Sequence, residues 1–507
     1  MEGWLTLCFI AVSTLLAVWF SGGKSKPKKH LPPGPWTLPV IGSLHHVLSV
    51  LPHRTITELC RRHGPLMLLK LGEVPTVVVS SAEAVEQVMK TNDIAFSYRR
   101  TTELQDIVGF GGKGIIFAPY DNRWRQMRKV CIMELLNSKQ VKRMEDIRAE
   151  EVGRLLRSII TATAVGATVN ISLAKFPRGI SSLVLMVTRA VFGGKFARQE
   201  EYLREINQLL ELLGGFCLVD LFPSSRLVRW FSTCERRTKK SCDLIQHIIT
   251  GVLDERKVVR AAGDGACSTD DEDLLDVLLR LQEEDSLAYP LTTENITTVL
   301  FDIFAAGTDT TGTALEWAMS ELICHPEAMA KAQLEVREVL GHGRAIIGNS
   351  DLAKLHYLRM VIKEVLRLHP PGALLPRKTR EDCKIMGYDM LKDTNIYINV
   401  FAISRDPRYW NNPEEFNPGR FENNNVDYNG NSFEFTPFGG GRRQCPGIAF
   451  ATSLLEITLA NFLYHFNWML PGEASSASLD MSEKFGFTIG RTSNLHLKAI
   501  PYVRSTI

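Results

Sequence analysis

The chain has 507 residues, of which 45% are hydrophobic and 23% are charged, and its formal net charge is +3 at pH 7. This composition excludes a disordered chain and a small disulfide-stabilised scaffold, and the length fits two or three domains or one large enzyme domain. The 59 lysines and arginines nearly balance the 56 aspartates and glutamates, so nucleic acid is not an expected partner.

The first predicted element is a membrane anchor at the N-terminus. Residues 3–20 contain no charged side chain, and as a helix they would be about 27 Å long, which matches the endoplasmic reticulum bilayer. Only Glu2 is charged before this stretch, whereas four lysines lie between positions 24 and 29. A cleaved signal peptide, the alternative, has the reverse order. We therefore expect a retained single-pass anchor over residues 1–22 in the endoplasmic reticulum membrane, with the catalytic domain facing the cytosol.

A basic and proline-rich linker is predicted over residues 23–42. Its prolines at positions 32, 33 and 35 impose extended backbone and prevent helix formation. No repeat and no further uncharged run of about 18 residues follows, so residues 43–507 are predicted to be one large catalytic domain. The ten cysteines of the whole chain form no Cys-x-x-Cys pair, which favours a reducing compartment.

The body is predicted to be mainly α with a minor β part. Two short β-type runs, 66–71 and 76–79, flank a turn signal and indicate an early hairpin. Most of the rest has helical periodicity. The predicted helices are 82–90, 123–134, 142–160, 201–213, 242–257, 294–323, 326–340, 358–368 and the apolar stretch 448–466.

Residues 109–114 satisfy the Gly-x-Gly-x-x-Gly pattern of dinucleotide-binding loops. Strand-like residues and a proline follow, where the helix of such a site should begin. We therefore reject dinucleotide binding by this chain.

Three helical segments carry residue patterns that allow more than one interpretation. The run 305–312 contains two glycines and three threonines, which cost about 3 to 4 kcal/mol of helix propensity relative to alanine. It fits close helix packing, an early helix end at Gly307, or a local opening for O₂ and water above a flat cofactor. Trp124 and Arg128 share one helix face, as do Glu364 and Arg367. By themselves these pairs are ordinary features of a helix surface.

The strongest chemical signal is the glycine-rich run 438–447, which precedes an apolar helix. Its glycines permit a tight loop close to a bulky ligand, and Cys445 is predicted at a helix N-terminus, where a thiolate is stabilised. Arg442 and Arg443 add positive charge. Such a thiolate is a metal ligand or a nucleophile, and the alternative is a buried structural cysteine in a glycine turn.

This run resembles the Phe-x-x-Gly-x-Arg-x-Cys-x-Gly signature of the cytochrome P-450 family of haem-thiolate monooxygenases, through Phe438, Gly441, Arg443, Cys445 and Gly447. The resemblance implies the cytochrome P-450 fold and haem b as the cofactor. It makes Cys445 the axial ligand of the iron, Arg443 a partner of a haem propionate, and Phe438 a shield for the sulfur. A thiolate ligand favours O–O cleavage.

The same resemblance gives roles to other residues. It implies that Thr310 hydrogen-bonds the bound dioxygen and that Asp309 belongs to the proton-delivery route. Trp124, Arg128 and Arg377 are then further haem-propionate contacts.

A structural trio is also implied by the resemblance. Glu364 and Arg367 match a buried Glu-x-x-Arg pair, and Arg420 completes it from the segment Pro418 to Phe421. The expected role of the trio is scaffolding.

The implied substrate pocket is mostly apolar, which favours a hydrocarbon-like substrate. Its predicted residues are Ile115, Ile116, Phe301, Ala305, Ala306, Leu374, Leu375 and Phe487. The chain is most similar to plant enzymes of specialised metabolism, in particular monocot terpenoid hydroxylases. We therefore expect hydroxylation of a sesqui- or diterpene, with O₂ and with electrons from NADPH through a membrane-bound flavoprotein reductase.

Three alternatives stay open at this stage. One is oxidation of a phenolic, indolic or other small aromatic metabolite. The second is a reductase-independent haem-thiolate isomerase or dehydratase, and the third is a non-catalytic haem sensor. The presence of Thr310 favours the monooxygenase.

Overall fold

The computed structural model describes residues 29–99, 102–136, 142, 144–171, 182–214, 217–262, 272–341, 343–473 and 478–502. The anchor predicted over residues 1–22 lies outside these residues. Among the residues that are described, no helix has the length and apolar character needed to span a bilayer.

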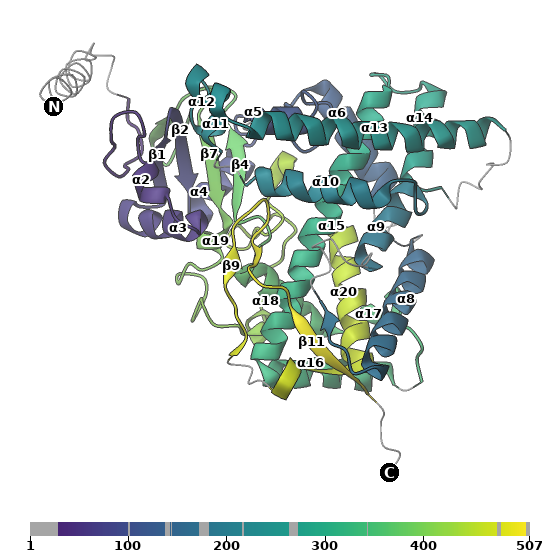
Figure 1. Cartoon of the computed structure of the whole chain (residues 1–507). Helices are drawn as coiled ribbons and strands as arrows, with labels where there is room; N and C mark the ends of the chain where they lie inside the picture. Colours follow the sequence, from purple (N-terminus) through teal and green to yellow (C-terminus); the bar gives the residue numbers. More distant parts are fainter. Residues whose placement is uncertain are drawn as a thin grey trace, which may run out of the picture.

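Helices make up most of the structure, and Figure 1 shows them packed beside a small sheet that lies near the first described residues. The α-helices are α2 (Leu44–Val47), α3 (Pro52–His63), α4 (Ala82–Glu86), α5 (Glu103–Val108), α6 (Asn122–Val130), α8 (Glu145–Ala164), α9 (Ser182–Phe192), α10 (Gln199–Leu212), α11 (Leu218–Leu221), α12 (Arg226–Phe231), α13 (Cys234–Ala261), α14 (Leu274–Glu284), α15 (Thr293–Cys324), α16 (Pro326–Leu340), α17 (Asn349–Leu352), α18 (His356–Leu368), α19 (Val400–Ile403) and α20 (Ile448–His465). Each predicted helix is present. The segment 326–340 has the predicted ends, and most of the others have shifted ends. The predicted segment 242–257 is the middle of the longer α13, and 82–90 and 123–134 each end in a π-helical turn.

The strands form one four-stranded sheet and three smaller ones. They are β1 (Leu66–Leu71), β2 (Val74–Val79), β3 (Val169–Asn170), β4 (Leu374–Lys378), β5 (Cys383–Ile385), β6 (Tyr388–Met390), β7 (Asn395–Asn399), β8 (Phe466–Met469), β9 (Glu483–Lys484), β10 (Gly490–Arg491) and β11 (His496–Pro501). The order of the largest sheet is β1-β2-β7-β4. β1 and β2 are the predicted hairpin, with Leu71 opposite Val74, whereas β2 and β7 are parallel partners far apart in sequence.

Helix α15 connects the two largest hydrophobic clusters of the core. Its first half, up to Ala305, packs among α10, α13 and α14. Its second half, from Ala314 onward, packs against α18 and α20 around the buried Trp317. Between these halves, Ala306, Gly307, Thr310 and Thr311 line a cavity. The helix is buried on both flanks, as expected for one that is apolar on most sides.

Candidate active site

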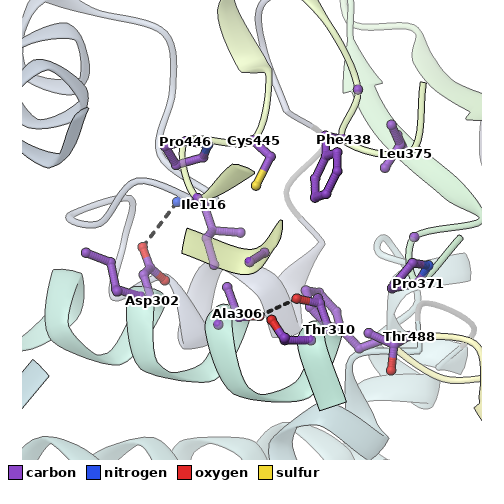
Figure 2. A pocket seen from close by; sticks show the side chains of 18 of the residues that line it. Ile116, Asp302, Ala306, Thr310, Pro371, Leu375, Phe438, Cys445, Pro446 and Thr488 are labelled. Carbon is purple, nitrogen blue, oxygen red and sulfur yellow. Dashed lines mark hydrogen bonds between the residues drawn. The ribbon is translucent and has the colours of Figure 1, made fainter. Parts of the chain in front are cut away.

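A cavity of about 350 Å³ lies against the middle of α15. Its walls come from that helix, from loops near residues 115, 372 and 487, and from the glycine-rich run at 438–447. Figure 2 shows the sulfur of Cys445 pointing toward the helix that carries Ala306 and Thr310. Segments far apart in sequence therefore converge on one site.

Most residues predicted for the cofactor, the dioxygen site and the substrate pocket line this cavity. They are Ile115, Ile116, Trp124, Arg128, Ala306, Thr310, Leu374, Leu375, Arg377, Phe438, Arg443, Cys445, Gly447 and Phe487. Phe301 and Ala305 are not among the lining residues, because they point into the helical core beside α10 and α14. The helical period places Asp302, Ala306 and Thr310 on the cavity face instead.

The glycine-rich loop is held in a shape that glycine permits. Gly441 has a φ of 64°, and a Cβ added to it would come within 2.3 Å of the Met89 carbonyl oxygen. The backbone N–H of Cys445 donates to the carbonyl oxygen of Phe438 at 3.0 Å, which closes the loop just before α20. This conformation places the Cys445 side chain at the cavity.

The Cys445 thiol is half-buried and opens on the cavity. Burial raises its pKa, and the backbone N–H of Gly447 and the guanidinium groups of Arg128 and Arg99 oppose that shift without cancelling it. A thiolate at this position therefore needs a stronger positive partner, and a coordinated metal ion deprotonates a thiol outright.

Four arginines line the same cavity: Arg99, Arg128, Arg377 and Arg443. Among the described residues none of the four makes an ion pair with a carboxylate. Arg443 donates to the carbonyl oxygens of Ser97 (2.8 Å) and Ala118 (2.7 Å). Burial and then mutual repulsion lower the pKa of Arg443 to about 8 and that of Arg377 to about 9. The cluster thus calls for an anionic ligand.

These observations fit a haem group. The buried Nε of Arg99 and Nη1 of Arg443 have no hydrogen-bond partner among the described residues, and the two carboxylates of a haem would supply partners. The Cys445 sulfur is one of the side-chain ligands that haem iron takes in proteins. The sequence analysis did not identify Arg99, since only its position beside the other arginines distinguishes it.

Trp124 is placed by two contacts. Its indole N–H donates to the carbonyl oxygen of Ile115 at 3.0 Å, and the guanidinium carbon of Arg443 lies 4.0 Å from the centre of its ring. The side chain thus orients Arg443 and holds the loop that carries Ile115.

Helix α15 is continuous through Gly307, which rules out an early helix end there. The Thr310 hydroxyl donates to the carbonyl oxygen of Ala306 at 2.7 Å (Figure 2). Such hydroxyl contacts compete with the backbone hydrogen bonds of a helix and often bend it. Asp309 does not line the cavity, and its Oδ2 accepts a hydrogen bond from Thr488 at 2.8 Å.

Asp302 is a cavity residue that the sequence analysis missed. Its Oδ2 accepts the backbone N–H groups of Ile115 (2.7 Å) and Ile116 (3.1 Å), the second of which is drawn in Figure 2. Burial raises its pKa to about 6 against these hydrogen bonds and the charge of Arg99. An acidic residue one turn before Ala306 in an apolar helix was the available signal.

The predicted structural trio is buried and assembled. Glu364 and Arg367 have fully buried side chains, with Nε to Oε2 at 2.7 Å. Arg420 approaches from the short helix η3 (Pro418–Phe421), and its Nε lies 2.9 Å from Oε1 of Glu364. The trio therefore joins α18 to η3. Glu364 and Arg367 are not an ordinary ion pair on a helix surface, because both side chains are buried.

Comparison with known proteins shows the family of the chain. The cytochrome P-450 family model matches residues 32–495. Zealexin A1 synthase of Zea mays is 43% identical over 94% of each chain, and 5-epiaristolochene 1,3-dihydroxylase of Nicotiana tabacum is 42% identical over 97% of each. Dolabradiene monooxygenase of Zea mays is 44% identical, covering 96% of this chain and 95% of its own. A solved structure of a zebra fish cytochrome P-450 with abiraterone matches at a TM-score of 0.72 and 25% identity, over 89% of this chain and 100% of that one.

Proposed function

The chain belongs to the cytochrome P-450 family, and from that premise we propose that it is a haem-thiolate monooxygenase that oxidises a terpenoid with one oxygen atom of O₂. One observation carries the proposal: the Cys445 sulfur, the four cavity arginines and Thr310 surround a single cavity with largely apolar walls. The relatives that the chain resembles are named for terpenoid oxidation.

The proposed cofactor is haem b. Cys445 would bind its iron, and Arg99, Arg128, Arg377 and Arg443 would hold its carboxylates. A haem with a thiolate ligand activates O₂ for insertion of one oxygen atom into a C–H bond. Phe438 and the closed glycine loop keep water from the sulfur.

Protons are proposed to reach the dioxygen site from α15. Thr310 faces the cavity, and its hydroxyl has a resting acceptor in the Ala306 carbonyl. Asp309 lies one residue earlier, and its carboxylate holds the Thr488 hydroxyl. We assign to Thr310 the final donation of a proton and to Asp309 its supply.

The substrate class follows from the walls of the cavity. Ile115, Ile116, Leu374, Leu375 and Phe487 present hydrocarbon surface, and apolar walls bind an apolar skeleton. A sesqui- or diterpene is the first candidate, and a small aromatic metabolite is the second. An isomerase or a sensor would not need the proton route that Thr310 provides.

A membrane location is proposed together with the anchor over 1–22, the linker over 23–42 and the catalytic domain over 43–507. Leu218, Leu227, Trp230 and Phe231 on α11 and α12 are between 62% and 75% exposed. Ser224, which lies between those helices, donates to Glu73 at the tip of the β1–β2 hairpin. Such a cluster of large apolar side chains supports contact with lipid on the N-terminal side of the molecule.

The electron donor is proposed to be an NADPH-dependent flavoprotein reductase. Arg125 and Lys129 are exposed on α6, and Arg442 is exposed beside Cys445. The neighbouring Arg128 donates to the Gln444 carbonyl oxygen, so α6 and the cysteine loop form one surface. Its positive charge suits an acidic redox partner.

The test of the proposed function is the absorption spectrum of the reduced, carbon-monoxide-bound protein. The full chain should show the red-shifted band of a thiolate-ligated haem, and Cys445→Ala should abolish it because the iron loses its sulfur ligand. Cys242→Ala removes another buried thiol, in α13 and away from the cavity, and should keep the band. A red-shifted band in Cys445→Ala would overturn the assignment.

A further inference from the structure

We propose that Asp302 binds the substrate, accepting on its free carboxylate oxygen a hydrogen bond from a hydroxyl group. The preferred substrate is then an apolar skeleton that already carries one hydroxyl, rather than a bare hydrocarbon. This inference rests on the proposed function and narrows its substrate class.

The two carboxylate oxygens of Asp302 have different surroundings. Oδ2 accepts two backbone N–H groups, at 2.7 and 3.1 Å. Oδ1 is buried and has no hydrogen-bond partner among the described residues. The residue is 2% exposed and lines the cavity. A buried charged oxygen without a donor is costly, so a ligand that brings a donor into the cavity gains a strong hydrogen bond.

The carboxylate is held rigidly. Gly114 lies so close to it that an added Cβ would come within 2.2 Å of Oδ2. The next residue, Ile115, is fixed on both sides, since its N–H donates to Asp302 and its carbonyl accepts from Trp124. A preorganised acceptor loses little entropy when a ligand binds.

The charges around the cavity favour a neutral donor over an ammonium group. The charge of Arg99 acts on Asp302, but among the described residues the two make no ion pair. Four guanidinium groups line the same cavity. The two carboxylates of the proposed haem would offset only part of their charge, so a positive excess opposes the entry of another cation. A hydroxyl satisfies Oδ1 without that repulsion.

The position of Asp302 also predicts where the substrate is oxidised. Asp302, Ala306 and Thr310 are four residues apart on one face of α15, so Asp302 and Thr310 are separated by roughly 12 Å along the helix. A hydroxyl held at Asp302 therefore places the far end of a fused-ring skeleton beside Thr310. The substrate must come from a reaction that installs a hydroxyl, and the new oxygen enters at a remote carbon.

The test compares three ligands with one sesquiterpene skeleton: the hydrocarbon, its secondary alcohol and the matching ketone. Binding to the full chain is measured by absorption difference titration and independently by calorimetry. The alcohol should bind at least about tenfold more tightly than the ketone, the range expected of a hydrogen bond to a charged group. Asp302→Asn should abolish this preference, because the amide oxygen keeps the two backbone N–H groups while the NH₂ can donate to the oxygen of either the alcohol or the ketone.

Glu294→Gln is the matched control. Glu294 pairs with Lys113 and ties the same loop to the start of α15, yet it does not line the cavity. This variant should keep the preference for the alcohol. If it loses that preference as Asp302→Asn does, loop position accounts for the effect and the proposal is overturned.

Other outcomes separate this inference from the proposed function. Equal binding of alcohol and ketone by the wild type, or tighter binding of the corresponding amine, would overturn the role of Asp302 while the carbon-monoxide band upholds the haem assignment. A wild type without that band would refute the proposed function, and calorimetry would still decide the preference for the alcohol.

Discussion

At the scale of single residues, Thr310 occupies the place where α15 meets the cavity. Its hydroxyl is the polar group that the helix presents beside Ala306, and it rests on the Ala306 carbonyl oxygen at 2.7 Å. This hydrogen bond to the Ala306 carbonyl oxygen can break, and the Thr310 hydroxyl can then turn toward a ligand in the cavity. A residue that only stabilised the helix would not need to face the cavity.

We expect Thr310→Ala to lower product formed per NADPH by about a hundredfold, the size of a lost proton-transfer group. The electrons should appear as hydrogen peroxide, while the carbon-monoxide band stays unchanged because no haem contact is removed. Thr310→Ser keeps the hydroxyl and should restore most of the coupling. Unchanged coupling in Thr310→Ala would remove this side chain from the mechanism.

At the scale of elements, the buried carboxylate of Glu364 holds α18 and η3 together. It accepts four hydrogen bonds of 2.7 to 2.9 Å. The donors are Nε and Nη2 of Arg367, Nε of Arg420 and the backbone N–H of Asn417. No water is needed to satisfy this group. Loss of the Glu364 carboxylate would leave the buried guanidinium of Arg367 without a paired negative charge.

Glu364→Ala is expected to lower the free energy of unfolding by about 3 to 5 kcal/mol, because one partner of a buried ion pair is left without compensation. Thermal unfolding followed by circular dichroism measures the effect. Glu86→Ala breaks an exposed pair with Lys90, at 3.0 Å, and should cost less than about 1 kcal/mol. Equal effects of the two variants would contradict a structural role for the trio.

At the scale of the whole molecule, Glu483 links a helix from the first part of the described chain to a strand from its last part. It lies on β9, and its Oε2 is 2.9 Å from Nε2 of His53 and 2.7 Å from Nε of Arg54 on α3. Burial acts to raise the pKa of Glu483, but the hydrogen bonds from His53 and Arg54 outweigh it and lower the pKa to about 2. This contact therefore ties β9 to α3 across more than 400 positions of sequence.

The sign of the pH effect follows from that lowered pKa. The stabilisation by Glu483 is fully present above its ordinary pKa of 4.5 and is lost as the pH falls toward 2. Denaturant unfolding of the wild type and of Glu483→Gln should therefore differ most at about pH 6, differ less at about pH 3, and converge at about pH 2 and below. A difference that stays constant with pH would show that the charge of Glu483 does not carry the effect.

Much of the fold was predictable because it is local. The hairpin of β1 and β2 and the helices α15, α16 and α18 follow from patterns of polar and apolar residues within one segment. The glycine-rich loop before α20 was also predictable, since its shape depends on adjacent residues. The pairing of β2 with β7 was not, because it joins strands more than 300 positions apart through side-chain packing.

The residues by themselves determined that the protein is a large, mainly helical body with a cysteine loop of the cytochrome P-450 type and a polar interruption in one apolar helix. The tertiary structure alone decided that Arg99 joins the other cavity arginines, that Asp302 faces the cavity, and that Phe301 turns into the core. The physical reason is that charge and burial depend on neighbours in space. A helical period says which residues share a face, and only packing decides what that face meets.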